Sequence, residues 1–298
     1  MAEIMMCEPF ELYNLLNQCS CVSRLAEINY LCLIDARETQ DYRMSHIITA
    51  KNVKMDSEGM FLLPEAVEVD SMRHMVVYDS NTSCLQEQGR AVECAQALAK
   101  ASLHPVHIVR GGFQRFSALY HFLRTEKIIY TIMELESLKI YPVEVLAGLL
   151  YMGDQKQGMD SSILKDLKIS AFISMLQSDT QDRAPTIVNK LFLNCYKYFL
   201  VSFIEAGNQL MFCLLFSDTH INMGSKVLIV SRQGRSRCSA VTIAFLMHHL
   251  KYTLEQAWTH LLKCKSSMRP NRGFMQQLSE WELHKTGTKV NDIFEPHF

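Results

Sequence analysis

The chain has 298 residues, enough for two domains of ordinary size that each bury a core of their own. Its 30 basic and 31 acidic residues nearly cancel, which gives no reason to expect nucleic acid or an anionic membrane as a partner. Ten cysteines lack the paired spacing of a zinc site, which favours reduced thiols and predicts no bound metal.

The N-terminal stretch MAEIMMCEPFELYN carries early acidic residues and lacks a basic start followed by an apolar core. This pattern argues against a secretory signal and a transit peptide. No apolar run approaches the roughly 18 residues of a membrane span. We therefore expect a cytoplasmic protein without a cofactor, and import into an organelle through an unconventional signal stays open.

The first half of the chain alternates short apolar strands with helical patterns. Strands are predicted at residues 30–36, 74–80 and 105–111, and residues 87–102 predict an amphipathic helix. Strands that alternate with helices predict βα units around a parallel sheet, with sites at the carboxyl ends of the strands.

Three segments of this half carry a resemblance to a known family. They are LIDARETQDYRMSHIITAKNV at residues 33–53, HMVVYDSNTSCLQEQGRA at 74–91 and VHIVRGGFQRFSALYHFL at 106–123. In this order they resemble the rhodanese domain, with Ser45 at a position where the family has glycine. The resemblance implies a rhodanese-like domain at residues 7–125.

The resemblance also locates the place where an active sulfurtransferase needs its cysteine, immediately after the second strand. The strand runs instead into Asp79 and Ser80. Cys84 follows a few residues later, and Arg90 lies six residues after it. Sulfur transfer through Cys84 therefore stays open, beside the simpler interpretation that Cys84 lies at a loop-to-helix junction.

The second half repeats the α/β pattern after a connection at residues 126–139. Apolar strand patterns lie within residues 140–154, 169–176 and 226–231, and helices close the domain. We predict a second α/β domain at residues 140–285, followed by a polar tail at 286–298.

A candidate anion site follows the strand of residues 226–230. The loop contains one glycine and leads directly into an apolar helical run, so backbone N–H groups and the positive helix end meet at one place. Arginine on the first helical turn matches phosphate through its planar pair of donors. The candidate phosphate-binding residues are Ser231, Arg232, Gln233, Gly234, Arg235, Ser236 and Arg237. A plain strand-turn-helix corner with solvated arginines is the alternative.

The stretch VSRQGRSRC at residues 230–238 resembles the signature loop of the cysteine-dependent tyrosine and dual-specificity phosphatases. Residues 141–154 and 263–282 extend the resemblance. It implies phosphate-binding roles for Gly234 and Arg237. The position of the nucleophilic cysteine is occupied by Ser231, and that of the preceding histidine by Val230. The residue after the arginine, a hydroxyl in the family, is Cys238.

These departures predict that hydrolysis is absent. A thiolate is activated by loop amides and a helix end, whereas a serine hydroxyl stays protonated unless a base lies beside it. Cys238 is expected to be a structural thiol rather than a substitute nucleophile. In the region where the family has its acidic residue the sequence offers Glu205, which we expect to be a surface residue.

The two resemblances together match the architecture of the MAP kinase phosphatases, and most closely the STYX-like pseudophosphatases. In the former, the first module docks the kinase through an arginine cluster. Here the corresponding stretch has Lys51 and Lys54 beside Asp56 and Glu58, which makes docking there doubtful. We expect a catalytically inactive regulator of phosphoproteins or other signalling proteins such as kinases or phosphatases. A sulfurtransferase and a purely structural adaptor are the alternatives.

Overall fold

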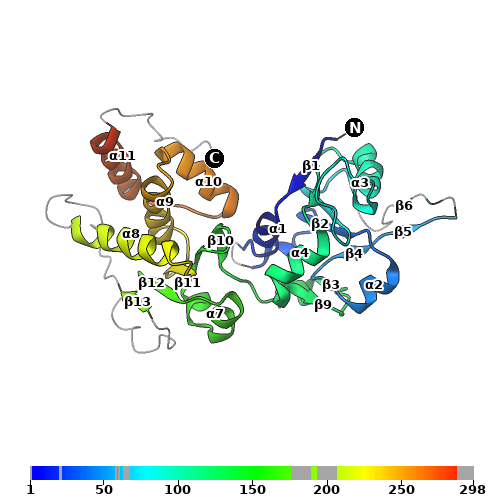
Figure 1. Cartoon of the computed structure of the whole chain (residues 1–298), viewed down its shortest axis with the longest axis horizontal. Helices are drawn as coiled ribbons and strands as arrows, with labels where there is room; N and C mark the ends of the chain where they lie inside the picture. The colour runs from blue at the N-terminus through cyan, green and yellow to red at the C-terminus, as the bar shows by residue number, and fades with distance from the viewer. Residues whose placement is uncertain are drawn as a thin grey trace. The chain divides into compact units, whose positions relative to one another are not determined.

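A computed structural model describes residues 2–19, 22–57, 59, 61–62, 68–175, 189–192 and 207–286. The chain divides into two compact units, Met1–Ile140 and Tyr141–Phe298. Each unit has a five-stranded sheet of its own with helices packed on it (Figure 1). The predicted α/β class of both halves is confirmed, and so is the parallel sheet predicted for the first half.

The first unit is built on an all-parallel sheet of order β1-β8-β7-β2-β4. Its strands are β1 (Ile4–Cys7), β2 (Leu31–Asp35), β4 (Lys51–Asn52), β7 (His74–Tyr78) and β8 (Val106–Val109). Two short antiparallel pairs accompany it, β3 (His46–Ile47) with β9 (Arg124–Thr125) and β5 (Lys54–Met55) with β6 (Phe61–Leu62).

The helices of this unit pack against the sheet and against one another. They are α1 (Pro9–Leu16), η1 (Arg24–Ala26), α2 (Thr39–Met44), α3 (Arg90–Ala101), α4 (Gly112–Leu119), η2 (His121–Leu123) and α5 (Ile132–Glu136). The buried face of α3 shares one core cluster with Ile34, Val77 and Ile108 of the central strands. Tyr13 of α1 stacks on Tyr120, which caps α4, with ring centroids 4.5 Å apart.

Three boundaries differ from the sequence-based expectations. The strand β1 lies almost entirely before residue 7, and its four residues, IMMC, are all apolar, so the sequence shows no alternation there. The helix α3 starts at Arg90 rather than at residue 87, because residues 87–89 belong to the loop before it. The connection at residues 126–139 contains α5, which begins with a capping box between Thr131 and Glu134.

The second unit has a sheet of order β10-β11-β14-β12-β13. Its strands are β10 (Val143–Leu146), β11 (Leu150–Asp154), β12 (Ala171–Ser174), β13 (Asn189–Phe192) and β14 (Val227–Ser231). The pair β10–β11 is antiparallel because residues 147–149 are too few for the crossover that a parallel pair requires. The other three pairs are parallel, with β14 in the middle.

The helix that follows β14 is the centre of this unit. The helices are α6 (Gln155–Met159), α7 (Ser161–Leu167), α8 (Gly207–Asn222), α9 (Arg237–His249), α10 (Leu254–Cys264) and α11 (Arg272–Thr286). Every residue from Cys238 to Met247 is buried, since α9 contacts α8, α10 and α11 as well as the sheet. A helix that is apolar all round belongs in such a core.

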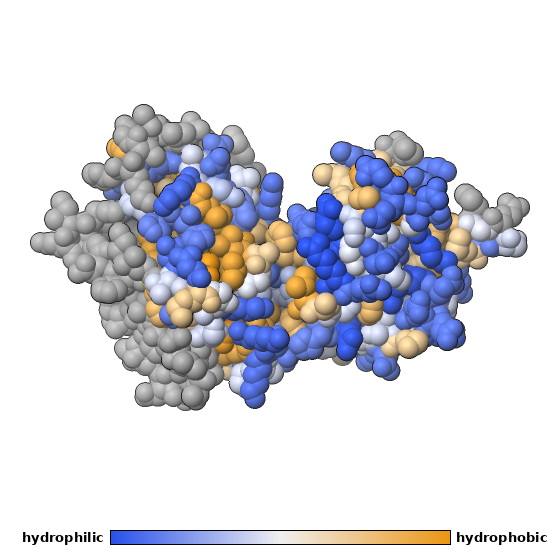
Figure 2. Space-filling model, viewed as in Figure 1, coloured by the Kyte–Doolittle hydropathy of each residue, from blue (hydrophilic) through white to orange (hydrophobic). Residues whose placement is uncertain are grey.

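The surface of the two units differs in character on the face shown in Figure 2. Most visible side chains of the first unit are hydrophilic, whereas the second unit shows a strip of apolar side chains among polar ones. No helix within the described residues is long and apolar enough to cross a membrane. A cytoplasmic location stays a prediction, and most of the predicted polar tail at 286–298 lies outside the described residues.

Candidate functional site

The loop of residues 232–236 lies at the carboxyl end of β14, between its neighbours β11 and β12. Sites in parallel sheets collect at such strand ends. The strand ends at Ser231, and α9 begins at Arg237 with Ser236 as its N-cap. The chain thus turns directly from the central strand into the positive end of a buried helix.

Gly234 fits this loop tightly against β11. Its φ of +64° lies in the left-handed region that side chains rarely adopt. A Cβ at this position would lie 2.9–3.0 Å from backbone atoms of Gly153 and Asp154. Glycine is therefore required both by the conformation of the loop and by its contact with the end of β11.

A second segment braces the loop from the other side. The N–H of Arg269 donates to the carbonyl of Arg235 at 2.8 Å, and the N–H of Asn271 donates to the hydroxyl of Ser236 at 3.2 Å. Ser239 of α9 also donates to the Arg235 carbonyl, at 2.5 Å. In the described part of the chain, the N–H groups of residues 232, 233, 236 and 237 donate to no backbone carbonyl.

Ser231 and Cys238 form a buried pair at the base of the loop. The hydroxyl of Ser231 donates to the Cys238 sulfur at 3.2 Å, and the two residues are 3% and 0% exposed. Burial raises the pKa of the Cys238 thiol, which outweighs the lowering effect of the hydrogen bond from Ser231. Cys238 is therefore a protonated thiol, as expected for a structural cysteine, and cannot take the proton of Ser231.

Val230 points away from this pair and into the core. It is fully buried, and a Cβ on Gly158 of α6 would lie 2.9 Å from its Cγ1 atom. The side chain thus fills space where α6 crosses the sheet. An imidazole at this position would have to fit between Gly158 and Phe172.

The polar side chains of the loop differ in their contacts with the rest of the chain. Arg237 is partly buried, and Arg232 and Gln233 are exposed. None of these three side chains forms a hydrogen bond or ion pair with any described residue. Arg235 does have a partner. Glu205, the residue considered for the role of acid, lies outside the described residues.

The first unit has an analogous loop after β7, and an internal carboxylate occupies it. Asp79 is 7% exposed and accepts hydrogen bonds from the N–H groups of Asn81 and Thr82, at 3.1 and 2.9 Å. It also accepts from the Thr82 hydroxyl at 2.6 Å and from the N–H of Ala91, in the first turn of α3, at 3.1 Å. The chain itself therefore supplies the anion that this loop and helix end favour.

Gly112 allows a second segment to brace this loop too. Its φ is +53°, and a Cβ would lie 2.4 Å from the Asp79 carbonyl oxygen. The N–H of Phe113 donates to that same carbonyl at 2.7 Å.

Cys84 and Arg90 do not meet in this loop. The Cys84 thiol donates to a carboxylate oxygen of Glu87 at 3.3 Å. Arg90 instead forms an ion pair with Glu38 and donates to the carbonyl of Ala36 at 2.6 Å. A reactive thiolate needs a positive environment, and Cys84 has a carboxylate beside it. This geometry does not favour sulfur transfer through Cys84.

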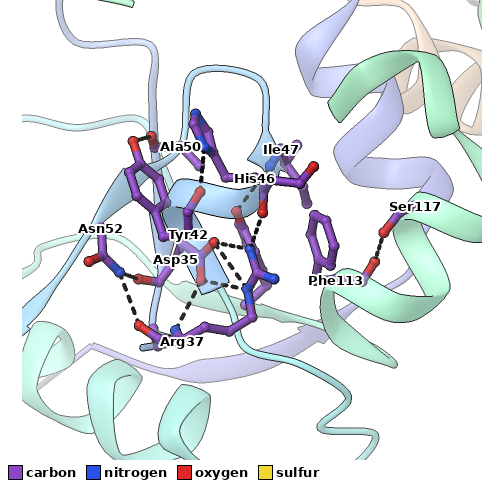
Figure 3. Close-up of polar contacts among 12 residues, drawn as sticks. Asp35, Arg37, Tyr42, His46, Ile47, Ala50, Asn52, Phe113 and Ser117 are labelled. Atoms are coloured by element: carbon purple, nitrogen blue, oxygen red, sulfur yellow. Dashed lines mark hydrogen bonds and ion pairs between the residues drawn. The ribbon is translucent and has the colours of Figure 1, made fainter. Parts of the chain in front are cut away.

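A buried ion pair fixes the neighbouring strand end (Figure 3). The Arg37 guanidinium donates to both carboxylate oxygens of Asp35, at 2.6–3.2 Å, and to the carbonyl of Ser45 at 2.7 Å. It also lies over the ring of Phe113, with 3.9 Å between its central carbon and the ring centroid. The carboxylate is fully buried and the arginine is 7% exposed, so Arg37 is not available to a ligand.

The stretch considered for kinase docking contains exposed lysines. Lys51 begins β4 and Lys54 begins β5, and both are exposed. Asp56 is partly buried and has a partner, while Glu58 lies outside the described residues.

Comparison with known proteins bears on both units. The family described as "Dual specificity phosphatase, catalytic domain" matches residues 150–284, and "Rhodanese-like domain" matches residues 10–119. The chain joins a rhodanese-like domain to a domain of dual-specificity phosphatase type. It is related to the MAP kinase phosphatases and other signalling phosphatases.

Three curated relatives illustrate this relationship. A probable rhodanese domain-containing dual specificity protein phosphatase of Dictyostelium discoideum is 24% identical over 63% of this chain and 39% of its own length. Human dual specificity protein phosphatase 16 is 24% identical over 84% of this chain and 40% of its own length. Serine/threonine/tyrosine-interacting protein B of Xenopus laevis is 28% identical over 47% of this chain and 63% of its own length. The chain thus spans about two fifths of the first two relatives.

Sequence reasoning did not foresee what surrounds the two loops. It identified Asp79 as the residue in the cysteine position of the rhodanese-like domain, but it did not predict the four hydrogen bonds that Asp79 accepts. The signal in the sequence that could have indicated these bonds is a carboxylate directly after a parallel strand and before a helix. It also missed the contact between Ser231 and Cys238. Within the described residues, no group of three or more His, Cys, Asp or Glu side chains could hold a metal ion.

Proposed function

We propose that the phosphatase-like domain binds phosphate groups without hydrolysing them. The observation that carries the proposal is the hydroxyl of Ser231, which donates to the protonated Cys238 thiol where the family resemblance expects an attacking thiolate. By this proposal the protein regulates phosphorylated or phosphatase-regulated signalling partners by occupancy or scaffolding.

The argument against hydrolysis concerns the nucleophile and its activation. A serine attacks only if a base removes its proton, and within the described residues the hydroxyl of Ser231 bonds to Cys238 alone. Val230 places an alkyl side chain where the family has an imidazole. Loss of a nucleophile costs on the order of 10⁶ in turnover in a well-studied hydrolase.

The argument for binding concerns groups that the loop retains. Arg237 and the N–H groups of residues 232, 233, 236 and 237 have no acceptor among the described backbone carbonyls, at the positive end of α9. Ser231 is neutral, so no thiolate repels an incoming phosphate dianion. Charge-assisted bonds contribute about 1.5–3 kcal/mol each.

The proposed partners follow from the relatives. One relative is named serine/threonine/tyrosine-interacting protein B, and another is named MAP kinase phosphatase with leucine-rich repeats protein 1. Kinases and phosphoproteins are therefore the partner class to test first. The chain spans about two fifths of the length of the first two relatives, so this partner class is part of the proposal.

A titration with a phosphotyrosine peptide tests the binding. We expect wild type to bind and Arg237→Ala to weaken binding at least tenfold, because the planar donor pair is lost. The exposed Arg43 of α2, in the rhodanese-like domain, gives the control Arg43→Ala, which makes the same charge change and should bind like wild type. Equal binding by wild type and Arg237→Ala would support the structural adaptor instead.

A further inference from the structure

A cavity of about 520 Å³ lies beside β2 in the rhodanese-like domain. Its lining includes Leu31, Cys32 and Leu33, the first three residues of that strand. Neighbouring side chains of a strand point to opposite faces of the sheet. Three consecutive residues that line one cavity therefore meet it along the edge of the strand, where their backbone groups lie.

This part of the edge of β2 has no partner strand within the described residues. On one side, β2 pairs with β7 over all of its residues, Leu31–Asp35. On the other side, β4 pairs with Ile34 and Asp35 alone. The edge along residues 31–33 is thus open on the side of β4, and an open edge is a template for a further strand.

The N–H groups of Leu31 and Leu33 face this open edge. Alternate residues of a paired strand direct their backbone groups to alternate sides, and the carbonyl of Asp35 accepts from the N–H of Val53 on the β4 side at 3.2 Å. Leu31 and Leu33 stand at the alternate positions before Asp35, so their groups point to the same side. Cys32, which lies between them, directs its own groups to β7. Outside the helices and strands, no described backbone hydrogen bond involves Leu31 or Leu33.

The side chains around the cavity are apolar or charged. Lys51 of β4 and Glu68 are exposed, and neither side chain forms a hydrogen bond or ion pair with a described residue. Ile28, which is 83% exposed, and Met72 add apolar surface. Thr49 has a φ of +67°, which β-branched residues rarely adopt, and strained positions of this kind cluster at ligand sites. A ligand that matches this lining carries apolar groups and charges of both signs.

We propose that the open edge of β2 binds an extended peptide segment of a partner protein, which adds a strand beside residues 31–33. An extended backbone offers carbonyl groups at the spacing of the N–H groups of Leu31 and Leu33. The segment has apolar or β-branched residues at alternate positions, a basic side chain for Glu68 and an acidic one for Lys51. This site is independent of the proposed phosphate-binding loop and requires no phosphate on the partner.

Selection of ten-residue peptides displayed on phage, with the full chain as bait, tests the chemistry of the partner. We expect wild type to select alternating apolar residues with one acidic and one basic position. Glu68→Lys should select an acidic residue where wild type selects the basic one, and should bind the synthetic wild-type peptide at least tenfold more weakly. The exposed Glu126, after β9, gives the matched control Glu126→Lys, which should select and bind like wild type.

Hydrogen exchange of the full chain with that peptide identifies how it binds. The N–H groups of Leu31 and Leu33 should exchange at least tenfold more slowly in the complex, whereas those of Cys32 and Ile34, already paired with β7, should change little. Leu31→Pro removes one donor at the first position of the strand, where proline is tolerated, and should weaken binding without lowering resistance to urea.

Three results would overturn the inference and leave the proposed phosphate site untouched. The first is that wild type enriches no peptide sequence. The second is that wild type and Glu68→Lys select the same sequences. The third is a bound peptide that protects neither the Leu31 nor the Leu33 amide, which would assign it to another surface.

Discussion

Two loops of this protein share one construction and differ in charge. Each follows a parallel strand, leads into a helix and is braced by a second segment through a close glycine contact or backbone hydrogen bonds. In the rhodanese-like domain the carboxylate of Asp79 accepts hydrogen bonds from backbone N–H groups of the loop and of the following helix, and Arg90 pairs with Glu38. In the phosphatase-like domain Arg237 has no partner among the described residues. A loop of this kind can bind an anionic ligand only if no carboxylate of the chain already occupies its N–H groups.

The largest effect is expected from restoring the family's catalytic residues to the loop of the phosphatase-like domain. Val230→His with Ser231→Cys supplies the thiolate and the imidazole that the family resemblance calls for. We expect wild type to hydrolyse an aryl phosphate no faster than the uncatalysed reaction. The double variant should exceed that rate by about 10²–10⁴, since the nucleophile is restored while the sequence offers only Glu205 as a general acid. Release of the phenol is followed by absorbance, with the two proteins purified side by side.

Two further variants make this result interpretable. Because an imidazole must fit between Gly158 and Phe172, Ser231→Cys alone shows whether the substitution at 230 disturbs the core. The exchange Ser231→Cys with Cys238→Ser prevents a disulfide between two sulfurs that would lie side by side. Turnover by wild type would contradict the proposed function. Inactivity of all variants, with phosphopeptide binding retained, would assign the defect to the general acid, for which the sequence offers only Glu205.

The second-largest effect is expected from removing the carboxylate of Asp79 from the loop of the rhodanese-like domain. Asp79→Ala leaves the N–H groups of Asn81, Thr82 and Ala91 without their acceptor. We expect the rhodanese-like domain to lose about 2–4 kcal/mol of unfolding free energy, measured by hydrogen exchange of amides in β7 and β8. The exposed Asp70 offers the control Asp70→Ala, which should change the unfolding free energy of this domain by less than about 0.5 kcal/mol.

An added anion sharpens this experiment. Formate is small enough to replace the deleted carboxylate. It should therefore restore part of the protection against hydrogen exchange in Asp79→Ala, and it should leave the exchange of wild type unchanged. Equal stability of Asp79→Ala and wild type would mean that the hydrogen bonds of the carboxylate contribute no net free energy. The contrast between a filled loop and an open one would then lose its energetic basis.

The sequence was sufficient to predict the strand-loop-helix units and the composition of both loops. Apolar runs and the spacing of glycine and arginine are local properties, and the central strands β2, β7, β8 and β14 lie where the patterns indicated. The edge strand β1 was missed because its four residues are all apolar and too few to show the alternation of a half-buried strand. The antiparallel start of the second sheet depends on the length of one short turn.

The contacts within the sites could not be predicted in the same way. Ser231 and Cys238 are seven residues apart, and their contact depends on the path of the loop around Gly234. The pairing of Arg90 with Glu38, rather than with Cys84, joins residues that are 52 positions apart.

The smallest effect is the stabilisation of one domain, and not of the other, by inorganic phosphate, measured for both domains in one sample. Both tryptophans, Trp258 and Trp281, belong to the phosphatase-like domain, so tryptophan fluorescence follows the unfolding of that domain alone. Inorganic phosphate at about ten times its dissociation constant should stabilise this domain by about 1.4 kcal/mol, since it binds only the folded state. Amide exchange in β2 and β7 of the rhodanese-like domain should not change, because Asp79 already occupies its loop. Equal stabilisation of both domains would indicate a general salt effect, and chloride at the same ionic strength is the control that measures it.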